Sequence, residues 1–210
     1  MNLIVFDLEL NRYNAENIFD YHGAKQSLRG EIIQIGAVKI DEQGMVLDTF
    51  KANLRPQIYR RLSPFVAKVT GFTQKQMDAG MPMQETLSQF VCWCGADATL
   101  LEWGMDDVPV LRQNLFLYAQ DEQWPYCHYD LQQIFTRQYP LGEGDKLNLE
   151  SVITRLALPV EREYHDALSD ALYTADICRC LDLVKGIAEY PDEATQLRLS
   201  MCSVPQTEYR

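Results

Sequence analysis

Residues 2–10 read NLIVFDLEL, and this stretch decides how the rest of the chain is interpreted. It is rich in bulky apolar side chains, which favour a buried strand. Two acids interrupt it, Asp7 and Glu9, at positions i and i+2. Because successive side chains of a strand point to opposite faces, both carboxylates are predicted to lie on one face. Phe6 and Leu8 then point the other way, toward a core.

This pair of acids has two interpretations. Two like charges on one face of an apolar strand repel each other and are costly to remove from water. A divalent cation would relieve both costs, which makes Asp7 and Glu9 candidate metal ligands. Taken alone, the pattern fits a pair of acids at a solvated strand end equally well.

The remaining segments predict an α/β domain. Alternating or β-rich segments indicate strands at 31–40, 46–54 and 98–103, and at the start of 126–138. Apolar residues at helical spacing indicate helices over 62–69, 73–79, 83–95, 107–119, the end of 126–138, 147–157 and 166–185. Residues 11–30 are polar and are predicted to form a long connection. Three strands followed by alternating helices and strands predict a mixed sheet flanked by helices.

The composition limits the class of protein. A chain of 210 residues with 47% hydrophobic content fits one domain, expected over 1–185, and a tail at 186–210 whose order the sequence does not decide. No apolar run of about 18 residues and no basic leader are found, so we expect a cytoplasmic protein without a membrane segment. The formal net charge of −11 argues against a coat for duplex DNA. It is compatible with a nuclease that holds one strand end, because acids that bind cations lower the formal charge.

A second pair of chemical groups lies in YHDALSDALYTADI, residues 164–177. Asp166 can cap the helix that follows, which places His165 just before the helix and Asp170 about one turn inside it. The start of a helix can therefore hold a mobile imidazole beside a fixed carboxylate. By itself His165 fits an ordinary hydrogen-bonded loop residue. Only the other candidate site residues favour a catalytic role for it.

A third acid is expected in WGMDDVPVL, residues 103–111, at a turn from strand to helix. An Asp at the start of that helix would project toward the end of the sheet. Asp106 and Asp107 both fit this position. The other one is expected to cap the helix or to be solvated.

In this order, the motifs D-x-E, D-x-x-x-L and H-x₄-D resemble those of the DEDDh exonucleases of the DnaQ-like, ribonuclease-H-like superfamily. EIIQIGAV at 31–38 and VTGFT at 69–73 are further matches, and the resemblance covers roughly 1–185. FDLELN and WGMDD are most similar to the branch that contains KapD and the Eri-type RNA exonucleases. Proofreading exonucleases usually carry Thr or Ser after the Glu of the first motif, where this chain has Leu10, so a proofreading role is not expected.

The resemblance implies a ribonuclease-H-like mixed sheet flanked by helices and a 3′→5′ exonuclease activity. It implies two divalent cations, Mg²⁺ with Mn²⁺ able to substitute, held by four carboxylates: Asp7, Glu9, Asp107 and Asp170. Asp107 is preferred over Asp106 because its spacing to Leu111 matches the D-x-x-x-L motif. His165 is implied to be the general base, since an imidazole can accept a proton near neutral pH.

The expected substrate is the 3′ end of single-stranded RNA or DNA, with a slight preference for RNA from the family branch, and the expected products are nucleoside 5′-monophosphates. Candidates for contact with the terminal bases are Leu10, Phe72 and Trp103, although each fits a core position at least as well. A basic stretch either follows the phosphates or is a solvated face: Arg55, Arg60, Arg61, Lys68 and Lys75. Two other functions stay open, a hydrolase of nucleotides or short oligonucleotides and an inactive module that binds nucleic acid.

Overall fold

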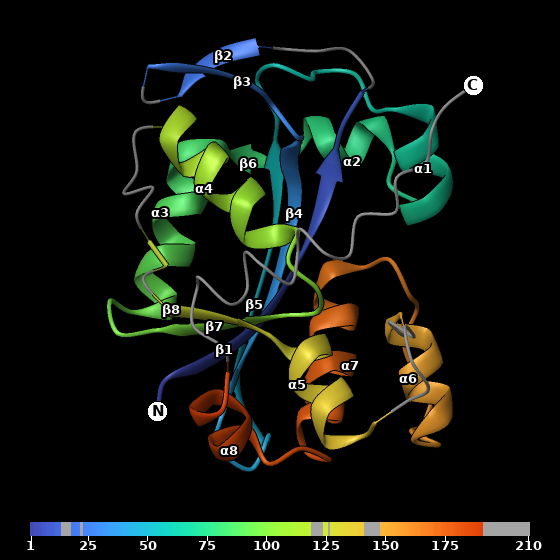
Figure 1. Ribbon diagram of the computed structural model, residues 1–210. Helices are drawn as coiled ribbons and strands as arrows, with labels where there is room; N and C mark the ends of the chain where they lie inside the picture. Colours follow the sequence, from blue (N-terminus) through green and yellow to red (C-terminus); the bar gives the residue numbers. More distant parts are fainter. Residues whose placement is uncertain (14–17, 22, 119–123, 126, 141–147, 191–210) are drawn as a thin grey trace, which may run out of the picture.

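The computed structural model describes residues 1–13, 18–21, 23–118, 124–125, 127–140 and 148–190 (Figure 1). Its main sheet has six strands in the order β6-β5-β4-β1-β7-β8. Three long strands form its antiparallel part: β1 (Leu3–Asn11), β4 (Glu31–Ile40) and β5 (Val46–Arg55). Three short strands pair in parallel with their neighbours: β6 (Met81–Pro82), β7 (Thr99–Glu102) and β8 (Cys127–Asp130). The predicted mixed sheet is confirmed.

Helices cover both faces of the sheet (Figure 1). One face packs against α3 (Met83–Cys94) and α4 (Asp107–Leu117), and the other against α5 (Leu131–Gln138), α6 (Leu149–Arg155) and α7 (Ala167–Cys178). The short helices α1 (Pro64–Thr70) and α2 (Gln74–Asp78) enclose a small third cluster.

Strand β1 divides its side chains between these two cores. Ile4, Phe6 and Leu8 pack on the side of α3 and α4, whereas Leu3 and Val5 pack on the side of α5 to α7. Because side chains alternate along a strand, Asp7 and Glu9 continue the row of Leu3 and Val5. The two acids therefore share the face that α7 covers.

Helix α7 lies unusually close to the sheet. It packs across β1 and β4, and its first turn meets β4 at Gly36, the residue paired with Asp7. A Cβ atom at Gly36 would lie 2.0 Å from the backbone nitrogen of Leu168. Only glycine permits this approach, which brings the start of α7 next to the first acid of β1.

The prediction that residues 11–30 form a connection without strands is wrong. Strands β2 (Ile18–Tyr21) and β3 (Ala24–Ser27) form a two-stranded hairpin within this segment. The sequence of β3 is AKQS and all four of its side chains are exposed, so no alternation of apolar and polar residues marks it.

The prediction of one helix over 166–185 is also wrong. Helix α7 ends at Cys178, and α8 (Leu183–Ala188) begins after a break. The side chain of Asp182 accepts a hydrogen bond from the backbone nitrogen of Lys185 and so starts the new helix. Apolar residues on both sides of the break kept the helical spacing and concealed it.

The predicted boundary between the domain and its tail, after residue 185, falls within α8. Helix α8 continues past residue 185, and residues 191–210 lie outside the described part of the chain, so the boundary after 185 stays a prediction. Among the described helices, none is long and apolar enough to cross a membrane.

Candidate active site

The predicted site residues come from three elements that meet at one edge of the sheet. Asp7 and Glu9 lie toward the carboxyl end of β1. Strand β7 runs parallel to β1 and leads into α4, whose first residue is Asp107. The carboxyl ends of parallel neighbours lie at the same edge, so Asp107 faces the acids of β1. His165 and Asp170 reach the same edge because the first turn of α7 sits against Gly36.

Among the described residues, Glu9, His165 and Asp170 form a tight group of possible ligands. Each offers one ligand atom, and these atoms all lie within 4.8 Å of one another. Asp7 and Asp107 are outside this group, yet the charge of Asp107 raises the pKa of Asp7 and the charge of Glu9 raises that of Asp107. All five predicted residues thus belong to one electrostatic cluster.

The acids of β1 are held where ionisation is unfavourable. Burial is the largest cause that raises the pKa of Asp7 well above its usual value, followed by the charges of Asp107 and Asp170. The pKa of Glu9 is raised to about 9, again by burial first and then by the charge of Asp7. A bound cation would stabilise both carboxylates in their charged forms.

Asp170 has a carboxylate oxygen that the described residues leave without a hydrogen bond. Its side chain is buried, with 9% relative exposure, and Oδ2 accepts a hydrogen bond from the backbone nitrogen of His165 at 3.0 Å. Oδ1 is buried and has no hydrogen-bond partner among the described residues. Burial raises the pKa of this carboxyl to about 6, although the interactions with His165 lower it. A buried, unpartnered carboxylate oxygen in an acidic cluster fits a hard divalent cation.

Asp107 and Asp106 occupy different environments. Asp107 is the first residue of α4 and is partly buried, whereas Asp106 is exposed and makes no side-chain capping bond. Burial, then the charges of Glu102 and Asp106, raise the pKa of Asp107 well above its usual value. These surroundings support the preference for Asp107 as the ligand.

Sequence reasoning missed Glu102, the last residue of β7. Its side chain has 1% relative exposure, and its Oε2 accepts hydrogen bonds from the backbone nitrogens of Asp107 at 2.9 Å and Val108 at 3.2 Å. Glu102 therefore caps α4 and fixes the backbone that carries Asp107. Burial raises its pKa to about 8. An acid inside the otherwise apolar run TLLEW, residues 99–103, was the available signal.

Asp106→Asn and Asp107→Asn, made side by side, test this assignment. We expect Asp107→Asn to lower turnover by about a hundredfold or more, because it removes one charge from the ligand set. Asp106→Asn should change turnover less than about threefold, since that side chain is solvated. Steady-state rates at saturating Mg²⁺ measure both. The reverse order of effects would transfer the ligand role to Asp106.

His165 stands at the open side of the cluster. Its side chain is exposed, and its backbone adopts the left-handed conformation with φ of 63°. The predicted cap is confirmed, because the side chain of Asp166 accepts a hydrogen bond from the backbone nitrogen of Ser169. The imidazole therefore lies before the helix, beside the carboxylate of Asp170.

The three candidates for base contact differ in exposure. Phe72 has 7% relative exposure and packs in the cluster with Val66 and Met77, which is the core alternative for this residue. Leu10 and Trp103 are partly buried and each retains exposed surface. Leu10 and Trp103 are therefore the better candidates for contact with a base.

A hollow beside the end of β1 was missed by sequence reasoning. Its volume is about 660 Å³, and its walls are Arg12, Tyr13, Ser63, Pro64 and Phe65. Buried Asn11 fastens the neighbouring loop: its Nδ2 donates to the carbonyl oxygens of Tyr59 and Arg61, each at 2.8 Å. The hollow thus begins at Arg12, the first residue after the strand that carries the acids.

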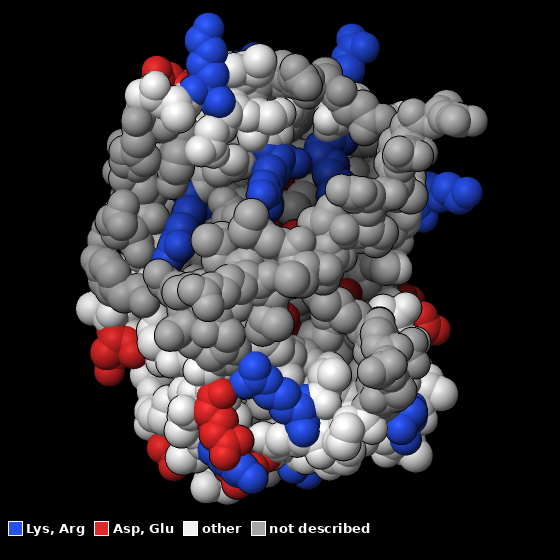
Figure 2. All heavy atoms as spheres, viewed as in Figure 1, with Lys and Arg blue, Asp and Glu red and all other residues white. Residues whose placement is uncertain are grey.

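Basic side chains are spread over the face shown in Figure 2. Lys and Arg side chains lie both above and below the crevice, and acidic side chains are visible inside it. The predicted basic residues are all exposed: Arg55, Arg60, Arg61, Lys68 and Lys75. Exposure is compatible both with contact to phosphates and with a solvated face.

Known proteins share the sequence pattern of this chain. A family model described as Exonuclease matches residues 4–178. The chain is 25% identical over 207 residues to the Probable 3′-5′ exonuclease KapD of Bacillus subtilis (strain 168), covering 92% of this chain and 91% of that protein. It is 32% identical over 96 residues to ERI1 exoribonuclease 2 of Homo sapiens, covering 40% of this chain and only 14% of the human protein.

Solved structures share the fold. The nuclease domain of 3′hExo, described as a DEDDh family member bound to rAMP, has a TM-score of 0.70 and 21% identity, covering 88% of this chain and 92% of that one. A 3′-exonuclease described with 3′-end specific recognition of a histone mRNA stem-loop has a TM-score of 0.71 and 19% identity, covering 88% and 82%. These likenesses confirm the predicted ribonuclease-H-like sheet.

Proposed function

Because the chain belongs to the exonuclease family, which confirms the predicted resemblance, we propose that it removes nucleotides one by one from the 3′ end of single-stranded RNA or DNA. The observation that carries this proposal is the convergence of four carboxylates and one imidazole at one edge of the sheet. The buried Oδ1 of Asp170, which has no hydrogen-bond partner in the described part of the chain, supports it further.

Two divalent cations are the proposed cofactors. Asp7, Glu9, Asp107 and Asp170 would hold them, and their hard oxygens suit Mg²⁺, for which Mn²⁺ should substitute. When bound, the cation pair supplies positive charge that polarises the scissile phosphate and stabilises the leaving oxygen. The raised pKa values of Asp7 and Glu9 mean that their ionised forms are unfavourable without a nearby positive charge.

His165 is the proposed general base. Its exposed side chain lies within reach of Glu9 and Asp170, on the side of the cluster from which water can enter. The imidazole accepts a proton from the attacking water, whose oxygen bonds to phosphorus as the bond from phosphorus to the 3′-oxygen breaks. The 3′-oxygen takes a proton from solvent and leaves as the hydroxyl of the shortened strand. The neighbouring carboxylates are not proposed as the base, because they would serve as ligands of the cations.

The strand is proposed to lie across the cluster and the hollow at the end of β1. Leu10 and Trp103 would contact the terminal base, while Tyr13 and Phe65 offer ring surfaces for the next one. Phe65 has 64% relative exposure, which a core residue of this size does not need. Arg12, in the same hollow, supplies a positive charge for a phosphate.

RNA is the proposed preference. One relative with 32% identity over a shared segment is called an exoribonuclease, and one structural neighbour is described as bound to rAMP. KapD, which matches nearly its whole length, is described only as a probable 3′-5′ exonuclease.

A time course on 5′-labelled single strands tests the proposal. RNA and DNA of equal sequence are incubated with Mg²⁺, Mn²⁺ or EDTA. We expect a ladder that shortens from the 3′ end with either cation, no reaction in EDTA, and faster cleavage of RNA. No cleavage of either strand in either cation would leave an inactive binding module as the better explanation.

A hydrolase of short oligonucleotides is a second candidate, because the formal net charge of −11 is unfavourable for long polyanions. It predicts rates that fall as the strand lengthens from about two to about twenty nucleotides, whereas the main proposal predicts rates that rise or stay level.

A further inference from the structure

The segment that carries His165 runs from Arg162 to the first residue of α7, Ala167. His165 is exposed, and its backbone φ of 63° is one that residues other than glycine rarely adopt. A histidine in such a position needs contacts on both sides if its ring is to stay in one place. The structure provides two sets of contacts, one from the sheet and one from the far side of α7.

The sheet holds the end of the segment next to α7. Lys51, on β5, forms an ion pair with Asp166, the neighbour of His165. Gln34, on β4, accepts a hydrogen bond from the backbone nitrogen of Ala167 at 2.8 Å, and its amide donates to Asn53 at 2.9 Å. Strands β4 and β5 thus fix the residues directly after His165.

The far side of α7 holds the start of the segment. The hydroxyl of Tyr173 accepts from the backbone nitrogen of Arg162 at 2.7 Å and donates to its carbonyl oxygen at 2.6 Å. The guanidinium of Arg162 lies 4.9 Å from the ring centre of Tyr173 and pairs with Asp176 at 2.7 Å. Arg162 is therefore bound to α7 by both its backbone and its side chain.

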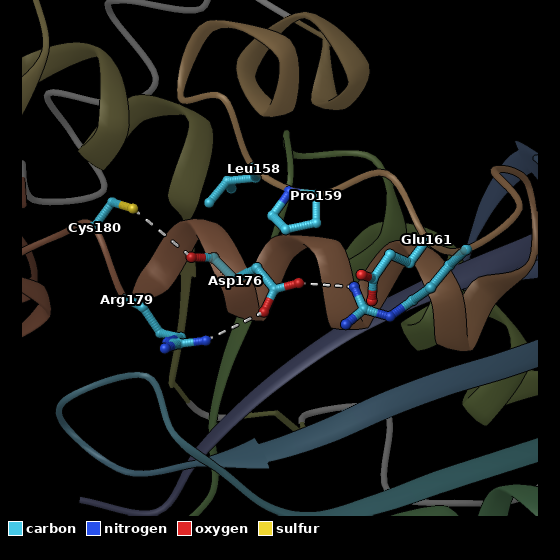
Figure 3. A pocket seen from close by; sticks show the side chains of 7 residues that line it. Leu158, Pro159, Glu161, Asp176, Arg179 and Cys180 are labelled. Carbon is cyan, nitrogen blue, oxygen red and sulfur yellow. Dashed lines mark hydrogen bonds and ion pairs between the residues drawn. The ribbon is translucent and has the colours of Figure 1, made fainter.

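A hollow lies behind this second set of contacts (Figure 3). Its volume is about 560 Å³, and Leu158, Pro159 and Glu161 line it on one side and Asp176 on the other. Because this space is open, side-chain packing alone does not prevent the segment from moving toward it. The ion pair between Arg162 and Asp176 bridges the two sides and resists that movement.

We propose that Lys51 and Arg162 are positioning residues that hold the His165 segment from its two ends and keep the imidazole beside Glu9 and Asp170. This inference rests on the proposed role of His165 as general base. Neither residue belongs to the tight group of possible ligands. Their loss therefore acts on turnover through the histidine and leaves cation binding intact.

The experiment compares Lys51→Met and Arg162→Met with their conservative counterparts and with matched controls. Lys51→Arg and Arg162→Lys keep the charge. Lys39→Met removes a lysine from β4 that lies over Trp93 instead, and Arg179→Met removes the more distant partner of Asp176, at 3.9 Å. Each change is made in the parent and in His165→Ala, and kcat, KM, the Mg²⁺ dependence and the melting temperature are measured.

In the parent, we expect each methionine variant at positions 51 and 162 to lower kcat about tenfold, with KM and the Mg²⁺ dependence changed less than about twofold. Lys51→Arg and Arg162→Lys should recover most of the rate, and both controls should stay near the parent. In the His165→Ala background, the same variants should have no further effect on kcat, because the group that they position is gone. The side chain of Lys51 is 41% exposed, so its replacement should leave the fold intact.

Two outcomes would overturn the inference. An unchanged kcat in both methionine variants would show that the contacts do not position His165. An equal loss in the His165→Ala background would show a general structural effect. Full activity of His165→Ala by itself is a separate result: it would overturn the general-base role, and with it the reason for the contacts.

Discussion

Replacing Asp7 with Asn is expected to abolish hydrolysis and, at the same time, to stabilise the metal-free protein. Burial and neighbouring acids raise the pKa of Asp7 well above its usual value, so the neutral amide relieves an unfavourable charge. We expect kcat to fall by about 10³-fold or more. The melting temperature of the metal-free protein at pH 8 should rise above that of the parent. Calorimetry and a single-turnover assay measure the two effects, and Asp97→Asn, an exposed acid at the other end of the sheet, is the control.

The pH dependence of the metal-free parent has the same origin. A carboxyl whose pKa is higher in the folded chain contributes stability that is full below its unfolded pKa and is lost as pH rises through its folded pKa. With folded pKa values of about 6 for Asp170 and about 9 for Glu9, the metal-free protein should lose stability from about pH 4 to about pH 9. Mg²⁺ should restore stability at the upper end. A melting temperature that ignores both pH and Mg²⁺ would contradict the metal-site interpretation.

Replacing His165 with Ala is expected to lower kcat by about 10²- to 10³-fold while the affinity for Mn²⁺ changes little, because a general base is lost and the four carboxylates remain. His165→Gln should be as slow as His165→Ala, since an amide fills the space without accepting a proton. Rates from pH 6 to 9 and titration calorimetry with Mn²⁺ measure the two quantities.

The same variant also tests whether His165 is a ligand. Its ring nitrogen lies in the tight group with Glu9 and Asp170, a geometry that a ligand would share. A large loss of Mn²⁺ affinity in His165→Ala would assign it to the ligand set. Activity equal to that of the parent across the whole pH range would exclude the general-base role.

Residues of the site could be predicted where a local rule applies. The two-residue period of a strand was enough to place Asp7 and Glu9 on one face, and the helix cap at Asp166 placed His165 and Asp170 correctly relative to α7. The choice between Asp106 and Asp107 needed the family motif, because both residues fit the start of α4.

Contacts between distant segments could not be predicted in this way. Glu102 caps the helix that carries Asp107, and Lys51 pairs with a residue 115 positions later in the chain. Such contacts depend on which strands lie side by side, and nothing local to Lys51 signals its partner. The hairpin of β2 and β3 was missed for a related reason, since the exposed side chains of β3 carry no hydrophobic period.

The contact at Gly36 makes the width of the site a property of the main chain. The first turn of α7 rests on the backbone of β4, at the residue paired with Asp7, and no side chain lies between the two. The contact between these two backbones therefore sets the distance between Asp7 on β1 and Asp170 on α7. A side chain added at Gly36 would push the start of α7 away from the sheet, so the distance between Asp7 and Asp170 depends on glycine at this one position.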